Sequence, residues 1–201
     1  SEACNDKEFA HYWMHNGFLN INNVKMSKSL GNFFTVREIA EKYDLQVLRF
    51  FMLSAHYRSP LNFSAELMEA SRNGLERILT AVDRLRTLNV QGEACTEEEN
   101  EQIKVFDALV AKYEAAMEDD FNTADAISAI FEMVKAANIH VTETSTAAFR
   151  DQILSEIVRL CDVLGIKTEK KEELLDDEIQ ALIDERQAAR KAKNFAHADE
   201  I

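Results

Sequence analysis

The chain has 201 residues, of which 46% are hydrophobic, with 5 Gly, 1 Pro and a formal net charge of -13 at pH 7. This composition excludes a disordered chain and a β-protein built of many tight turns, and it favours a mainly helical protein with a sizeable core. No apolar run approaches the roughly 18 residues of a membrane span, and three scattered cysteines predict free thiols in the cytoplasm with no disulfide framework.

The first elements are predicted to be a helix and a short strand. Residues 1–16 have the pattern of a polar helix that carries Phe9, Tyr12 and Trp13 on one face. A strand is expected over residues 17–21, and it leads into a polar loop that is followed by another helix. A loop between a strand and a helix is the context in which phosphate-binding loops occur.

This loop contains two lysines within four residues and is the most informative stretch of the chain. Lysine is a compact, flexible point charge, and serines with a nearby glycine allow a ligand to approach the backbone closely, so the loop suits a polyphosphate ligand. A solvated basic turn is the simpler interpretation of two lysines alone, and the segments around the loop decide against it. The loop reads Lys25-Met26-Ser27-Lys28-Ser29, followed by Leu30-Gly31-Asn32.

Capping residues predict two helices after the loop. Thr35 and Glu38 have the spacing of a capping box for a short helix that runs through about Lys42. Asp44 is expected to cap the next helix. Pro60 is expected to break that helix, because proline has no N–H to donate.

A bundle of helices is expected from residue 64 onward, because apolar residues recur with helical spacing through the long segments. A charged connection over residues 166–177 is followed by a last predicted helix over residues 178–194. The bundle segments are residues 65–88 after the cap Ser64, a helix after the capping box of Thr96 and Glu99, a helix opened by Asn122 or Thr123, and residues 146–164 before the helix-ending Gly165.

Four further segments have distinctive sequences: Gly31–Arg37, His56–Ser64, Asp119–Thr123 and Arg186–Lys193. Together with the lysine loop, and in this order, they resemble the C-terminal half of the cysteinyl-tRNA synthetase family of class I aminoacyl-tRNA synthetases. The resemblance implies that residues 1–63 are the end of the catalytic domain, with the stem-contact region as a small α/β segment. Residues 64–201 would be a helical domain of the anticodon-binding (DALR) type, truncated at its C-terminal end.

The resemblance implies an enzyme that activates cysteine with ATP and transfers it to tRNA(Cys), forming AMP and pyrophosphate. Lys28 would contact the ATP phosphates with help from Lys25, while Met26, Ser27 and Ser29 shape the loop. ATP is used with magnesium, the family's zinc is held by residues outside this stretch, and no metal ligand is assigned here. The partners are tRNA(Cys), ATP and cysteine, a monomer is expected, and this stretch alone is expected to be inactive.

Two other readings remain open at this point. The cysteine ligase of mycothiol synthesis resembles cysteinyl-tRNA synthetases and shares their lysine loop, but it joins cysteine to an amino sugar and needs no anticodon-reading domain. The third reading is a non-catalytic helical interaction module in which the basic loop is incidental.

The charge of the chain is unevenly distributed, which bears on tRNA binding because phosphate contacts need Lys or Arg. Residues 1–92 hold 11 basic and 10 acidic side chains, whereas residues 93–201 hold 12 basic and 26 acidic ones. Phosphate contacts are therefore expected near the loop and the helices that follow it. The candidates are Arg37, Lys42, Arg49, Arg58 and Arg72.

Other candidate sites are weaker. Cys4, His11 and His15 have zinc-binding side chains, but a structural zinc site needs a fourth ligand, so a metal site is not favoured. His56–Arg58 could contact nucleic acid or simply close a helix. Adjacent Asp119 and Asp120 could serve acid–base chemistry, but charges before a helix are commoner, so helix capping is the favoured role.

Overall fold

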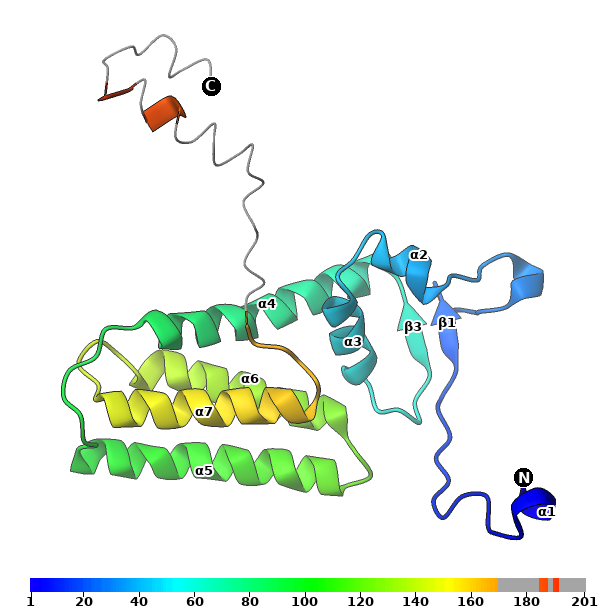
Figure 1. Cartoon of the computed structure of the whole chain (residues 1–201), viewed down its shortest axis with the longest axis horizontal. Coiled ribbons are helices and arrows are strands. Elements are labelled where there is room, and N and C mark those ends of the chain that lie inside the picture. Colours follow the sequence, from blue (N-terminus) through cyan, green and yellow to red (C-terminus); the bar gives the residue numbers. More distant parts are fainter. Residues whose placement is uncertain (170–184, 188–189, 192–201) are drawn as a thin grey trace. The chain divides into compact units, whose positions relative to one another are not determined.

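The computed structural model describes residues 1–169, 185–187 and 190–191, and helices dominate the first of these ranges (Figure 1). Residues Ser1–Glu169 form one compact unit, to which the description below refers. The mainly helical fold predicted from the sequence is confirmed. Most of the last predicted helix, over residues 178–194, lies outside the described residues, although positions 185–187 and 190–191 are helical.

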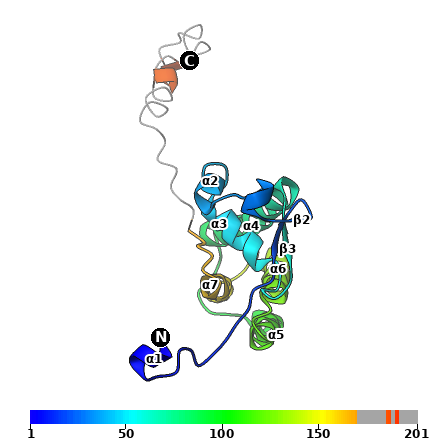
Figure 2. The same ribbon diagram turned by 90° about the vertical axis from the view of Figure 1, so that its right-hand side faces the viewer.

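Four helices form the bundle and lie close to the predicted bounds. Each begins directly after a residue whose side chain accepts a hydrogen bond from a backbone N–H in the first turn. Ser64 and Thr96 were predicted as caps, Asn122 was one of two residues predicted to open its helix, and Thr146, predicted as the first helical residue, is the cap of α7. Figures 1 and 2 show α5, α6 and α7 side by side beneath α4. The helices are α4 (Ala65–Thr87), α5 (Glu97–Glu118), α6 (Thr123–His140) and α7 (Ala147–Val163).

The core of the bundle consists of apolar side chains at helical spacing, including Phe106 of α5 and Phe149 of α7, which meet edge to face at 6.1 Å between ring centroids. Gly165 ends the last helix in the left-handed conformation, with φ of 65°. Helix α3 (Leu45–Leu53), capped by Asp44 as predicted, packs on α4 and contributes Phe50 and Phe51 to the same core.

A three-stranded sheet lies beside α3. Its order is β2 (Val24–Lys25), β1 (Leu19–Ile21), β3 (Leu61–Phe63). Strands β1 and β2 are antiparallel, and β1 and β3 are parallel. The tight turn between β1 and β2 is made by Asn22 and Asn23, both with positive φ, which is the backbone geometry that two-residue hairpins prefer.

Three predicted elements differ from the structure in their bounds. The helix expected over residues 1–16 is limited to α1 (Glu2–Asn5), and the rings of Phe9, Tyr12 and Trp13 are 61%, 91% and 65% exposed. A short polar helix is unstable in water unless it packs against another element, and among the described residues none covers this face. In addition, α3 ends at Leu53, several residues before Pro60, and the capping-box helix α2 is only Val36–Ala40.

The capping box of α5 also joins the start of α5 to the start of α7. Glu99 is buried, and its carboxylate accepts hydrogen bonds from the backbone N–H of Thr96 at 2.9 Å and of Thr146 at 2.8 Å, and from the Thr146 hydroxyl at 2.8 Å. Burial raises the pKa of Glu99, but together these hydrogen bonds lower it by more than burial raises it, so the net shift of the pKa is downward. The ionised carboxylate therefore stabilises the fold at neutral pH.

We expect Glu99→Ala to lower the free energy of unfolding by about 2 kcal/mol at pH 7, because the buried donors of Thr146 and the partly buried backbone N–H of Thr96 lose their acceptor. The stabilisation by a carboxylate with a lowered pKa is present above its ordinary value of 4.5 and is lost as the pH falls through the folded pKa. The difference from the unsubstituted chain should thus shrink below that pH in urea titrations. Glu98→Ala, at an exposed position of the same turn, is the matched control, and an equal loss in both variants would contradict the role of Glu99.

Candidate functional site

The two lysines of the loop occupy different local structures. Lys25 is the last residue of β2, where it pairs with Asn20 of β1. Lys28 begins the single 3-10 turn η1 (Lys28–Leu30), which Ser27 caps by accepting a hydrogen bond from the backbone N–H of Ser29. The turn is closed by Gly31, whose φ of 67° suits glycine. The loop is thus ordered at both ends by local hydrogen bonds.

Asn32 holds the loop from within, a role that the sequence analysis did not assign. Its side-chain amide donates to the carbonyl of Lys25 at 3.2 Å, and its side-chain oxygen accepts from the backbone N–H of Ser27 at 2.9 Å. The hydroxyls of Ser27 and Ser29 lie 2.7 Å apart. The backbone N–H of Met26 donates to the carbonyl of Leu19 and joins the start of the loop to β1. A polar residue shortly after a serine turn was the available signal for Asn32.

Both ammonium groups are exposed, and neither has a carboxylate partner within the described part of the chain. Each lies over an aromatic ring instead, Lys25 Nζ at 5.6 Å from the Phe18 centroid and Lys28 Nζ at 5.4 Å from that of Phe33. An exposed cation–π contact contributes only about 0.5–1 kcal/mol, which is less than a charge-assisted hydrogen bond to phosphate. The lysines can therefore leave the rings for an anionic ligand.

The candidate metal ligands of the sequence do not come together in the described part of the chain. Among the described residues, no group of three or more His, Cys, Asp or Glu side chains is placed to hold a metal ion. Cys4, His11 and His15, which the sequence analysis considered for zinc, are exposed, and His11 lies 3.3 Å from Glu8. Burial raises the pKa of Cys161 to about 12, so that this thiol stays protonated.

Two segments that were considered separately meet in space. His56–Arg58 follows α3, and Asp120 lies in the turn between α5 and α6. The Tyr57 hydroxyl donates to Asp120 Oδ1 at 2.8 Å, and Arg58 donates from Nη2 to Oδ1 at 3.2 Å and lies with Nε 3.0 Å from Oδ2. His56 Nε2 is 3.7 Å from the same Oδ2. The hydrogen bond with Tyr57, followed by the charge of Asp120, raises the pKa of Arg58.

This arrangement corrects the role given to the aspartate pair. The side chain of Asn122, not of Asp119 or Asp120, caps α6. Asp119 is the C-cap of α5. Asp120 lies next to the side chains of His56, Tyr57 and Arg58. Sequence separation of more than 60 residues hid this contact, since periodicity and capping rules describe only neighbours along the chain.

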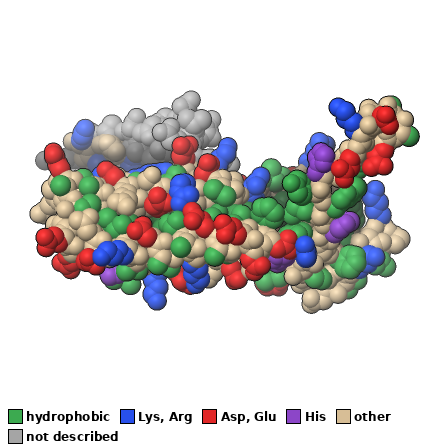
Figure 3. All heavy atoms as spheres, turned by 90° about the horizontal axis from the view of Figure 1, so that it is seen from below, with side chains coloured by type: hydrophobic (Ala, Val, Ile, Leu, Met, Phe, Trp, Pro, Cys, Tyr) green, Lys and Arg blue, Asp and Glu red, His purple; other side chains and the backbone are tan. Residues whose placement is uncertain are grey.

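Several of the arginines considered for phosphate binding already have partners. Arg58 is bound to Asp120, and Arg72 lies 3.1 Å from Glu69 and over the ring of Tyr43. The guanidinium of Arg49 lies beside Gly165, where an added Cβ would be 3.0 Å from Nη1. On the face seen in Figure 3, acidic and basic side chains are interspersed over the bundle and do not form one basic stripe.

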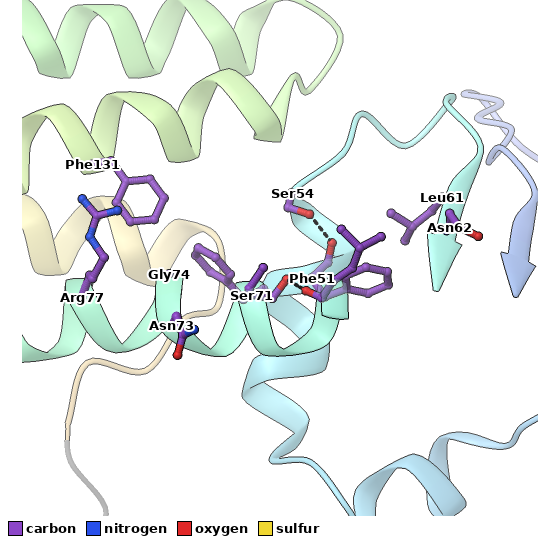
Figure 4. A pocket seen from close by; sticks show the side chains of 12 residues that line it. Phe51, Ser54, Leu61, Asn62, Ser71, Asn73, Gly74, Arg77 and Phe131 are labelled. Carbon is purple, nitrogen blue, oxygen red and sulfur yellow. Dashed lines mark hydrogen bonds between the residues drawn. The ribbon is translucent and has the colours of Figure 1, made fainter. Parts of the chain in front are cut away.

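A groove of about 490 Å³ lies between α3, α4 and β3, and its lining is mostly apolar (Figure 4). The hydroxyl of Ser54 donates to the carbonyl of Phe51 and that of Ser71 to the carbonyl of Leu67, so both are occupied within their own helices. At one end, the guanidinium of Arg77 lies over the ring of Phe131. The groove therefore offers no set of converging polar groups comparable to the lysine loop.

Two family models match segments of the chain. The family model of the tRNA synthetases class I (C) catalytic domain matches residues 1–73, and that of the DALR domain matches residues 112–169. Within the described residues, no helix is both long and apolar enough to cross a membrane.

Curated relatives match the whole chain. The cysteine–tRNA ligase of Lachnospira eligens is 61% identical over 100% of this chain and 43% of its own length. Those of Lachnoclostridium phytofermentans and Clostridioides difficile are 59% and 49% identical, and the match covers 44% of each. The chain thus spans less than half the length of these relatives.

A solved structure shares the fold at low sequence identity. It is a ternary LeuRS–tRNA–LeuAMS complex of Agrobacterium radiobacter K84, which matches 78% of this chain and 22% of the LeuRS chain with a TM-score of 0.59 and 23% identity. At this identity the likeness concerns the fold alone.

We expect Asn32→Ala to loosen the loop, because the backbone N–H of Ser27 and the carbonyl of Lys25 both lose their side-chain partner. Amide hydrogen exchange across residues 26–31 should become faster, while exchange in the bundle stays unchanged. Ser29→Ala, which removes only the hydroxyl contact with Ser27, serves as the control with a smaller effect. Unchanged exchange in Asn32→Ala would show that the asparagine does not hold the loop.

Proposed function

We propose that this chain, which belongs to the cysteine–tRNA ligases among the class I tRNA synthetases, supplies the ATP-phosphate loop and the tRNA-facing helices of an enzyme that ligates cysteine to tRNA(Cys). The observation that supports this most directly is the pair of exposed ammonium groups on an ordered loop without carboxylate partners among the described residues. The relatives are cysteine–tRNA ligases, which favours a tRNA ligase over an amino-sugar ligase or a non-catalytic module.

The reaction explains why cations are needed at this position. An oxygen of the cysteine carboxylate attacks the α-phosphorus of ATP, the bond from that phosphorus to the bridging oxygen breaks, and pyrophosphate leaves with the bonding electrons. A ribose hydroxyl of the tRNA then attacks the acyl carbon and AMP leaves. Negative charge grows on the β- and γ-phosphates in the first step, so cations placed there stabilise the transition state more than bound ATP.

Within this scheme, Lys28 contacts the departing phosphates and Lys25 assists it. A lysine can follow the moving charge, whereas the planar guanidinium of an arginine favours a fixed pairing. Met26, Ser27 and Ser29 shape the loop, the serines through their capping and hydroxyl contacts. Bound magnesium would add charge neutralisation at the phosphates.

The domain organisation that we propose separates residues 1–63, as the end of the catalytic domain with its stem-contact region, from residues 64–201, as the anticodon-binding-type bundle. The sheet and the lysine loop precede Ser64, and the four long helices follow it. We further propose that the complete enzyme is a cytoplasmic monomer, a setting that suits the free thiols Cys4, Cys95 and Cys161. The family's zinc would bind to residues outside this stretch.

In the complete enzyme, Lys28→Ala should lower the rate of cysteine-dependent ATP–pyrophosphate exchange by about 10²-fold, the usual cost of removing one group that stabilises developing charge. Lys104→Ala is the matched control, because Lys104 is an exposed lysine of α5 that pairs with Glu101. An unchanged exchange rate in Lys28→Ala would refute the proposed role of the loop.

The 201 residues by themselves should show no cysteine-dependent ATP–pyrophosphate exchange. The loop provides cations for phosphates, and we expect the adenosine and the cysteine to be bound by the remainder of the relatives' length. Exchange by the isolated chain above the rate of its Lys28→Ala variant would contradict this expectation.

A further inference from the structure

The turn between α5 and α6 has an unusual backbone. Asp120 and Phe121 have φ of 54° and 55°, so two consecutive residues other than glycine lie in the left-handed region. Such a conformation costs free energy and persists only where surrounding contacts determine it. One such contact is the hydroxyl of Thr123, which donates to the carbonyl of Leu53 at 2.7 Å and joins the turn to the end of α3. The backbone of this turn is thus held in a costly geometry that presents Asp120.

What Asp120 binds is the segment that leads from α3 to β3. Arg58 contacts both carboxylate oxygens, and Tyr57 shares Oδ1 with it. The rings of His56 and Tyr57 stack at 4.9 Å. Exposed ion pairs contribute little to stability. A two-point arginine contact combined with a tyrosine hydrogen bond nevertheless fixes the orientation of the two side chains relative to the carboxylate. Asp120 therefore sets how the 56–58 segment lies on the bundle.

The 56–58 segment in turn contacts the start of the sheet. The backbone N–H of Gly17 donates to the carbonyl of Tyr57 at 2.7 Å. The approach is so close that a Cβ at Gly17 would lie 2.2 Å from the carbonyl oxygen of Ser59. The backbone N–H of Leu61 then donates to the carbonyl of Phe18, and the parallel pairing of β1 with β3 begins.

The lysine loop is the next link in this series of contacts. The hairpin of β1 and β2 rests on β3 through the backbone N–H of Asn23, which donates to the side chain of Asn62 at 2.7 Å. Lys25 is the last residue of the hairpin, and the chain continues from it through the loop to Lys28. Hydrogen bonds therefore connect Asp120 to the loop through the 56–58 segment and the sheet.

We propose that Asp120 is a positioning residue for the lysine loop, which it orients toward the ATP phosphates through Tyr57, Arg58 and strand β1. This inference rests on the proposed function of the loop. The apolar contact of Phe63 with Phe51, at 5.8 Å between ring centroids, also holds β3 to the bundle. This edge-to-face packing holds β3 on the core at Phe63, whereas Asp120 holds the 56–58 segment that leads into the strand.

The test is a double-mutant cycle in the complete enzyme, measured by cysteine-dependent ATP–pyrophosphate exchange. Asp120→Asn keeps the size of the side chain and removes the charge that holds Arg58. It should lower kcat about tenfold, the scale expected when a reacting group is misplaced by less than 1 Å, and leave the KM for cysteine unchanged. Asp119→Asn, one residue earlier and exposed, is the matched control and should behave as the unsubstituted enzyme.

The background of Lys28→Ala separates a positioning role from a general loss of structure. If Asp120 acts through the loop, Asp120→Asn should cause no further loss once Lys28 is absent. An equal tenfold loss in both backgrounds would overturn the inference, and so would activity of Asp120→Asn equal to that of Asp119→Asn. If Lys28→Ala alone changed nothing, the proposed function would fail and this inference with it.

A second variant covers the case in which Asp120→Asn does not fold. Tyr57→Phe removes only the hydroxyl that binds Asp120 Oδ1 and leaves the ring stacked on His56. It should lower kcat in the same direction by a smaller factor and should again have no effect in the Lys28→Ala background. Full activity of Tyr57→Phe, in a protein whose Asp120→Asn variant is unfolded, would assign Asp120 to folding alone.

Discussion

The lysine loop has no apolar core of its own, and this constraint governs the rest of the structure. Its two lysines and two serines are polar, and the apolar Leu30, which directly follows the loop in η1, is 62% exposed. A surface loop of this kind keeps a defined position only if the elements on which it stands are fixed elsewhere. Here those elements are the short strands β1 and β3, and β3 is fixed by packing of Phe63 on Phe51 at the edge of the helical core. The bundle therefore gives the loop the stability that its own sequence cannot.

The weak contacts of the loop and the strong contacts of the bundle suit different tasks. The ammonium groups lie over aromatic rings, which costs little to reverse when an anion arrives. The Asn32 contacts, in contrast, preserve the path of the backbone while the lysine side chains move. In the bundle, by contrast, the Glu99 side chain itself is held in place. Its buried carboxylate joins the first turns of α5 and α7 through several hydrogen bonds that a small movement would break. Adaptable side chains on a fixed backbone are what a transition state with moving charge requires.

The sequence predicted those features that depend on neighbours along the chain. Ser64 and Thr96 cap helices where expected, and α6 and α7 begin within one residue of the predicted positions, because a cap needs only a side chain and the next three backbone N–H groups. The helix over residues 1–16 failed because its stability depends on a partner surface, which periodicity does not report. The loop was found from its own residues and its resemblance to a family, whereas Asn32 and Asp120 act through hydrogen bonds whose partners the motif does not name. Strand β3 escaped notice for a related reason, since three residues pair only because β1 lies alongside.

The acidity of the bundle constrains how it can face a polyanion. The whole excess of acidic side chains belongs to residues 93–201, and on the face seen in Figure 3 the charges of both signs are interspersed. Nucleic acid binds where cations are concentrated, and repulsion from carboxylates disfavours other approaches. Arg58, 65% exposed, keeps one side of its guanidinium on Asp120 and so cannot turn freely toward a phosphate. The carboxylate that we propose as the support of the loop thus also restricts this guanidinium, so a phosphate that approached Arg58 would have to compete with Asp120 for it.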